Sequence, residues 1–94
     1  MLVERSEIMI KPGSEPAFVE AMNGGGLAML RDVPGVRAVR LGRGVENPQK
    51  FMLLVEWQSM DDHTAFTQSA AFDPFRKLIF PHSAGGAMEH FEID

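Results

Sequence analysis

The sequence predicts an α+β domain in which helices cover one face of a four-stranded antiparallel sheet. Three observations predict it: residues 2–10 alternate as a strand does, residues 51–57 form a strongly apolar strand, and helix-cap signals follow both segments. The chain has 94 residues, about the size of one compact domain, so we expect residues 1–94 to form a single domain.

The first strand and the first helix have clear predicted boundaries. Alternation runs from Leu2 to Ile10, and Lys11-Pro12-Gly13 ends it because proline lacks the N–H that a strand ladder needs. Ser14 is a good N-cap for a helix from Glu15 to about Met22. Each of the three glycines at 24–26 costs a helix about 1 kcal/mol relative to alanine, which predicts a break or a loosened turn.

The later elements complete the pattern. Ser59-Met60-Asp61-Asp62 resembles a capping box and opens a helix that carries His63. Asp73-Pro74 is expected to interrupt the next helical segment, and residues 81–86 are expected to form a loop. The other predicted elements are a helix at 27–31, strands at 36–43, 51–57 and 87–93, and the helical segment at 70–80. This order of elements is the split βαβ arrangement of a ferredoxin-like domain.

The strand at 51–57 carries the prediction about assembly. Phe51-Met52-Leu53-Leu54-Val55 is apolar at every position, so both faces of this strand should be covered. The chain's own helices can cover one face, and few residues remain to cover the other. We therefore expect three large side chains on the helix-free face and a homodimer that packs through the sheet.

Composition excludes several classes of function. Nine Lys and Arg residues against thirteen Asp and Glu residues give a net charge of −4, which argues against nucleic acid as a partner. The absence of cysteine excludes disulfides, thiolate zinc sites and cysteine nucleophiles. No apolar run approaches the ~18–20 residues of a membrane span, and the first residues lack a signal-peptide pattern, so we expect no membrane contact and a cytoplasmic location.

Three histidines are the candidates for proton chemistry, with several glutamates, Glu4 among them, as possible carboxylate partners. His63 is either a histidine of the helix cap or a base at the mouth of a cavity. His82 is expected to be solvated and His90 to be a half-buried structural residue. No pair of ligands has a diagnostic spacing, so no metal site is predicted. Trp57, Phe66, Phe72 and Phe75 are placed where they can line a cavity.

Several segments together resemble one protein family. They are Val45-Glu46-Asn47-Pro48, the strand Phe51-Met52-Leu53-Leu54-Val55-Glu56-Trp57, and Ser59, His63, Phe66 and Phe72 beyond it. In this spacing they resemble the antibiotic biosynthesis monooxygenase (ABM) superfamily, and the resemblance extends over nearly the whole chain. It implies a dimeric α/β barrel in which each sheet and its helices enclose a cavity.

The resemblance also favours some activities of that family over others. The positions that the haem-degrading members use fall on Ser6, Phe66 and Arg76, and an arginine cannot be the neutral axial ligand of haem iron. The cofactor-free oxygenases that act on anthrones match better, at Trp57 and His63. We therefore expect no cofactor.

The leading hypothesis is a cofactor-independent monooxygenase that oxidises a small phenol, anthrone or quinol. His63 would remove a proton, Trp57 would orient the aromatic ring, and Arg76 would stabilise the developing anion. The expected substrate-binding residues are Ser6, Phe66, Phe72 and Phe75. Two alternatives stay open: a non-catalytic dimeric module that binds a hydrophobic metabolite, and an enzyme resembling a polyketide cyclase or isomerase on the same fold.

Overall fold

The computed structural model describes all 94 residues and contains the expected elements in the expected order. The strands are β1 (Leu2–Ile10), β2 (Val36–Arg43), β3 (Lys50–Trp57) and β4 (Ser83–Glu92). The α-helices are α1 (Glu15–Ala21), α2 (Leu27–Arg31), α3 (Met60–Thr67) and α4 (Phe72–Ile79), with a π-helical turn at Met22–Gly26 and a 3₁₀ turn at Phe80–His82.

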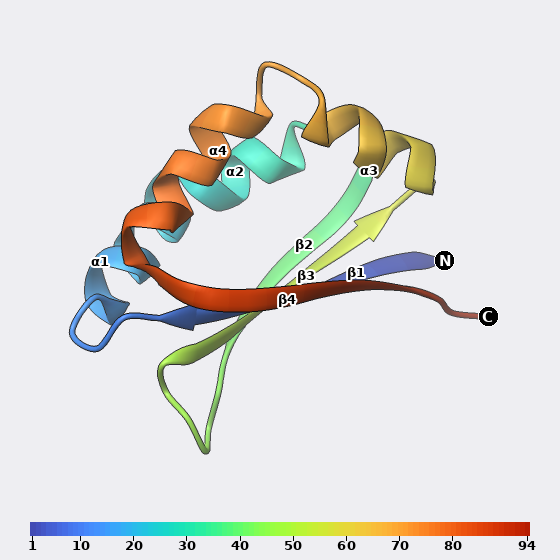
Figure 1. The fold of residues 1–94 in the computed structure, drawn as a ribbon. Helices are drawn as coiled ribbons and strands as arrows, with labels where there is room; N and C mark the ends of the chain where they lie inside the picture. Colours follow the sequence, from blue (N-terminus) through green and yellow to red (C-terminus); the bar gives the residue numbers. More distant parts are fainter.

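The four strands form one antiparallel sheet in the order β2-β3-β1-β4. All the helices lie over one face of this sheet, and β4 runs along an edge in front of it (Figure 1). The predicted ferredoxin-like fold is confirmed. No helix of the structure has the length and the apolar character that crossing a bilayer requires.

The core lies between the helices and the alternate residues of the two central strands. Along β3, Phe51, Leu53, Val55 and Trp57 are all buried on the helical side. Phe18 of α1 packs edge-on against Phe51, with ring centroids 4.9 Å apart. Two polar residues of β1, Glu4 and Ser6, are buried on the same side, although the other inward positions of that strand are apolar. These two residues mark the place in the core where a polar site can form.

The three glycines loosen the helix as expected. Helical turns continue through Met22–Gly26 in the wider π form, and Gly25 departs from helical geometry there. Gly26 is buried, and a side chain at this position would press on Met22. The turn thus lets α1 and α2 follow the sheet as one bent element.

Two predictions about the C-terminal third were wrong. Pro74 does not interrupt a helix, because α4 begins at Phe72 and the proline occupies its first turn, where no N–H partner is needed. Residues 83–86 are not a loop but the start of β4, since Gly86 and Gly85 pair with Ile8 and Met9 of β1. A side chain at Gly86 would collide with the backbone of Glu7, which is why glycine fits this strand.

The apolar run of β3 divides between the two faces of the sheet. Phe51, Leu53 and Val55 point toward the helices and are buried, whereas Met52 and Leu54 lie half-buried on the helix-free face. The run therefore presents two large side chains to that face and not the three expected, because strict alternation assigns the odd positions inward.

Candidate active site

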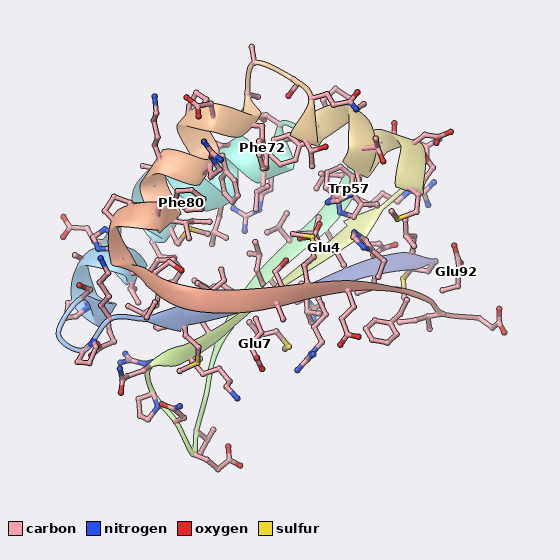
Figure 2. The ribbon with its side chains drawn as sticks, viewed as in Figure 1. Glu4, Glu7, Trp57, Phe72, Phe80 and Glu92 are labelled. Atoms are coloured by element: carbon pink, nitrogen blue, oxygen red, sulfur yellow. The ribbon has the colours of Figure 1, made fainter.

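The site is built around the buried carboxylate of Glu4. Alternation along β1 turns this side chain toward the helices, where only 5% of the residue is exposed. Ser6 Oγ donates a hydrogen bond to Glu4 Oε2 at 2.6 Å, and Trp57 Nε1 donates one to Oε1 at 3.0 Å. Figure 2 shows Glu4 and Trp57 between the sheet and the helices, while Glu7 points to the opposite face. Two donors from neighbouring positions thus fix the orientation of the carboxylate.

His63 of α3 lies beside this carboxylate. Its Nε2 atom is 3.4 Å from Glu4 Oε1, and its side chain is 12% exposed. The imidazole also packs edge-on against Trp57, with ring centroids 5.3 Å apart. Ser59 caps α3 by accepting a hydrogen bond from the Asp62 N–H, which fixes the first turn that carries His63.

The surroundings of His63 favour the neutral imidazole. Burial lowers the pKa of His63, the charge of Glu4 opposes this effect, and nearby His90 lowers the pKa further. Of the two expected locations for His63, the structure shows it at the wall of a cavity. A neutral imidazole beside a carboxylate can accept a proton, and the carboxylate stabilises the cation that forms.

His90 is the third member of the cluster. It pairs directly with Glu4 across the β1–β4 ladder, so the two side chains lie on the same face. Its Nε2 atom is 3.8 Å from Glu4 Oε1, and its ring centroid is 4.4 Å from that of His63. This nitrogen is buried and has no hydrogen-bond partner. The expectation of a half-buried histidine holds, but the residue also belongs to the polar site.

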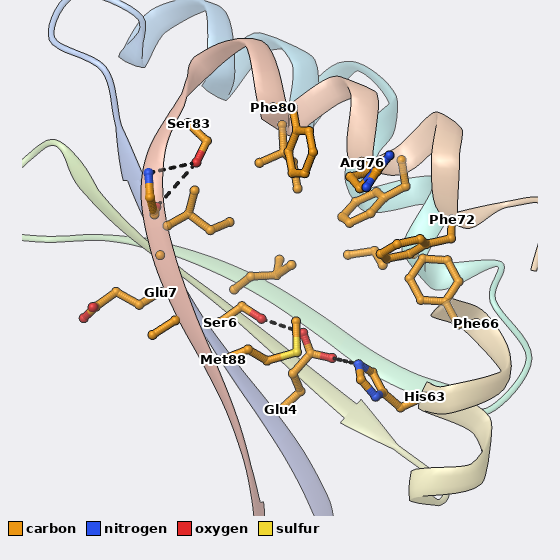
Figure 3. Close-up of a pocket in the computed structure, with 18 of the residues that line it drawn as sticks. Glu4, Ser6, Glu7, His63, Phe66, Phe72, Arg76, Phe80, Ser83 and Met88 are labelled. Carbon is orange, nitrogen blue, oxygen red and sulfur yellow. Dashed lines mark hydrogen bonds and ion pairs between the residues drawn. The ribbon is translucent and has the colours of Figure 1, made fainter. Parts of the chain in front are cut away.

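A cavity of about 580 Å³ opens above the cluster, between the inner face of the sheet and the helices. Figure 3 shows Glu4 and Ser6 on its sheet side, His63 reaching from α3 toward Glu4, and Phe66, Phe72 and Phe80 on the helical side. A cavity of this size lies within the range of about 300–1,000 Å³ that small-molecule sites occupy.

The helical wall of the cavity is aromatic. The ring of Phe66 lies 5.3 Å from that of Phe72 and 6.0 Å from that of Phe75, measured between centroids. Trp57 extends the cluster, 6.0 Å from Phe66. These rings offer both faces and edges to a flat apolar ligand.

Arg76 lies on the wall opposite the polar cluster. Figure 3 shows it on α4, across the cavity from Glu4 and His63. Its guanidinium is 4.7 Å from the centre of the Phe80 ring and 3.3 Å from Asp73, and its side chain is 45% exposed. This position separates the cation of Arg76 from the His63–Glu4 pair.

The structure brings together every residue that the sequence singled out for the site. The seven residues line one cavity: Ser6, Trp57, His63, Phe66, Phe72, Phe75 and Arg76. The sequence offered Glu4 and His90 as candidates for proton chemistry but did not bring them together with His63. The available signal was the alternation of the strand. It puts Glu4 on the same core-facing side as Leu2 and Ser6, where a carboxylate needs a partner.

The indole N–H of Trp57 has a partner within the chain. It donates a hydrogen bond to Glu4 and is therefore not free for a substrate. Trp57→Phe should therefore lower the free energy of unfolding by about 2 kcal/mol, because a buried carboxylate loses one of its donors. It should also weaken ligand binding, because Glu4 is no longer held in place. Urea unfolding and ligand titration of the variant measure both effects, with Ser6→Ala, which removes the other donor, for comparison. Wild-type stability and binding would reduce Trp57 to a packing residue.

Together, the fold and the site define a domain of the ferredoxin-like class, with an aromatic cavity that ends in a Glu–His cluster. The model of the family "Antibiotic biosynthesis monooxygenase" (ABM) matches residues 1–78. The chain belongs to this family, as its resemblance to the ABM superfamily indicated.

Individual relatives share the full length of the chain. An uncharacterised protein of Bacillus subtilis, YczJ, is 28% identical over 94 residues, which cover 98% of both chains. The structure of a candidate antibiotic biosynthesis monooxygenase from Bordetella bronchiseptica superposes with a TM-score of 0.92 at 29% identity, covering 99% of this chain and 96% of that one. SnoaB of Streptomyces nogalater, a cofactor-independent oxygenase, shares the fold at 14% identity, with a TM-score of 0.86 and coverage of 99% and 92%.

Proposed function

We propose that the protein is a cofactor-independent monooxygenase that oxidises a small phenol, anthrone or quinol. The observation that carries the proposal is the His63–Glu4 pair at the polar end of an aromatic cavity. Membership of the ABM family and the likeness to SnoaB, a cofactor-independent oxygenase, support it.

The first step is removal of a proton from the substrate. His63 Nε2 accepts the proton of the acidic O–H or C–H group, which leaves a phenolate or carbanion in the cavity. Glu4 acts as a positioning residue: its Oε1 atom, 3.4 Å away, stabilises the imidazolium that forms. Ser6 and Trp57 hold Glu4 in the orientation that this requires.

The second step is oxidation by dioxygen, the co-reactant. The substrate anion gives one electron to dioxygen, and the resulting radical and superoxide combine to form a C–O bond. The peroxide takes up the proton that His63 holds. For an anthrone, loss of the remaining C–H proton and cleavage of the O–O bond release water and leave a carbonyl group. The balance is one CH₂ group and one O₂ converted into one C=O group and one H₂O.

The walls of the cavity position the ring system. Phe66, Phe72 and Phe75 contact the flat faces and edges of the substrate, and Ser6 borders the substrate beside Glu4, to which its hydroxyl group donates. Arg76 attracts a polar or anionic group at the other end of the molecule, because it lies across the cavity from His63. A substrate with an acidic proton at one end and an oxygen-rich group at the other suits this arrangement.

Oxygen uptake with a panel of anthrones and hydroquinones tests the proposal. In the presence of a chelator, the protein should consume one O₂ for each anthrone converted, because the reaction needs only a base, desolvation and orientation. Turnover of a panel compound without oxygen uptake would favour an isomerase or cyclase. Tight binding without turnover would favour a binding module, and either result would contradict the proposal.

We also propose that the protein is a homodimer that packs through the helix-free face of the sheet. That face carries Met52 and Leu54 from β3 and Phe91 of β4, which is 45% exposed. Around them, Arg5 pairs with Glu89 at 3.1 Å. Because these two charges already pair within the chain, a second copy can cover the neighbouring apolar side chains without leaving Arg5 or Glu89 unpaired.

A further inference from the structure

We propose that Glu4, His63 and His90 form a binding site for one divalent transition-metal ion. The proposal goes beyond the oxygenase function, which requires no metal. It rests on three electron-pair donors that converge at one point from three separate elements, β1, α3 and β4.

The spacing of the donor atoms suits a metal ion. Glu4 Oε1 is 3.4 Å from His63 Nε2 and 3.8 Å from His90 Nε2, and the ligand atoms of the three residues all lie within 4.8 Å of one another. Tetrahedral coordination with bonds of about 2.0–2.1 Å places ligand atoms roughly 3.4 Å apart. Small side-chain rotations therefore bring all three atoms into coordination distance of one ion.

One member of the cluster has no hydrogen-bond partner of its own. His90 Nε2 is buried and has no hydrogen-bond partner, and its 3.8 Å separation from the carboxylate is too long for a hydrogen bond. Burying an unpaired polar atom costs about 1–3 kcal/mol. A cation between the carboxylate and the two imidazoles would satisfy His90 and balance the charge of Glu4.

The surrounding residues orient the carboxylate as metal sites require. Ser6 binds the distal oxygen, Oε2, and Trp57 uses only one of the two lone pairs of Oε1. Glu4 and His63 also line the cavity, so a remaining coordination position would face the space where small molecules bind. The arrangement has three protein ligands and an open position.

The ligand chemistry selects the class of ion. Two imidazoles and one carboxylate suit Zn²⁺, Co²⁺ or Fe²⁺, whereas Mg²⁺ and Ca²⁺ prefer oxygen ligands. A metal bound to His63 Nε2 occupies the lone pair that accepts the substrate proton. Metal binding and proton transfer therefore exclude each other, and a bound ion would inhibit the proposed oxygenase.

Titration of the untagged protein with Co²⁺ tests the site, read by the visible absorption bands of the bound ion, and Zn²⁺ binding is measured by calorimetry. We expect one ion per chain and a gain in thermal stability on binding. His90→Gln should weaken binding by at least about 10–100-fold, a loss that even outer-sphere changes cause at metal sites. Glu4→Gln should weaken it similarly.

His82→Gln is the matched control, because His82 is the remaining histidine of the chain and does not line the cavity. It should bind both ions within about twofold of the wild type. Absence of stoichiometric binding, equal binding by His90→Gln, or loss of binding in His82→Gln would each overturn the proposal. If circular dichroism shows that His90→Gln is unfolded, the comparison is made with His63→Gln. Calorimetry requires no turnover, so metal binding by a protein that consumes no oxygen would support this site and contradict only the oxygenase function.

Discussion

Replacing His63 with glutamine should lower the rate of substrate-dependent oxygen consumption by about 10²–10⁴-fold, the contribution expected of a positioned proton acceptor. Glutamine fills much of the same space and can donate a hydrogen bond to Glu4, but it cannot take a proton at neutral pH. The chain should stay folded, with a change in stability of about 1 kcal/mol or less. Steady-state oxygen uptake and urea unfolding of the same preparation separate the two effects.

The control for this variant is His82→Gln, which should keep wild-type turnover. Glu4→Gln should also slow the reaction, because the imidazolium loses its partner carboxylate. If the two residues act as a pair, the double variant His63→Gln/Glu4→Gln should be little slower than His63→Gln alone. Full activity of His63→Gln would remove this residue from the mechanism.

The fold was largely predictable because it depends on local patterns. The alternation of residues 2–10 and the unbroken apolar run from Phe51 identified the two central strands, and those strands supply much of the core. Cap signals at Ser14 and Ser59 located the starts of α1 and α3. In these places local preference and tertiary burial agree.

The boundaries that failed depend on contacts between distant segments. Gly85 and Gly86 indicate a loop when only their neighbours are considered, but pairing with β1 makes them part of a strand. Considered alone, Pro74 indicates a break in a helix. Because α4 starts at Phe72, however, the proline lies in the first turn, where it is tolerated. Neither outcome could be derived from propensity alone, because each depends on where another element begins or pairs.

The polar cluster of the site also depends on contacts between distant segments, which local sequence does not reveal. His63 and Phe66 follow Trp57 at short spacings, and the capped helix α3 carries both of them. Glu4 and His90 lie near opposite ends of the chain, and they meet only through the β1–β4 register. The search for metal ligands relied on local spacing motifs and so could not find a cluster whose members come from three elements.

Leu54→Asp should dissociate the proposed homodimer and unfold the chain together. Leu54 lies on the helix-free face, half-buried within the single chain. Its burial in an interface would contribute about 1.5–3 kcal/mol per copy, and two-fold symmetry places the substitution on both sides of the interface. The total stability of a small domain is about 5–15 kcal/mol. Losing this burial and forcing two carboxylates into an apolar contact should therefore both dissociate and unfold the protein. Sedimentation equilibrium and circular dichroism at low micromolar concentration measure both effects.

The position of Leu54 makes this variant a sharp test between a monomer and a dimer. Its cross-strand neighbours are Arg5 and Arg40, so in a monomer the new carboxylate would lie in water between two cations. Such pairs stabilise a sheet by roughly 0.2–1 kcal/mol, and a monomer should therefore tolerate the substitution or gain stability. Val45→Asp makes a similar apolar-to-acidic change at a residue that is 89% exposed in the β2–β3 turn, and it should change neither assembly nor folding. A folded wild-type species of 10.4 kDa at low micromolar concentration, or a stable Leu54→Asp variant of wild-type mass, would contradict assembly through this face.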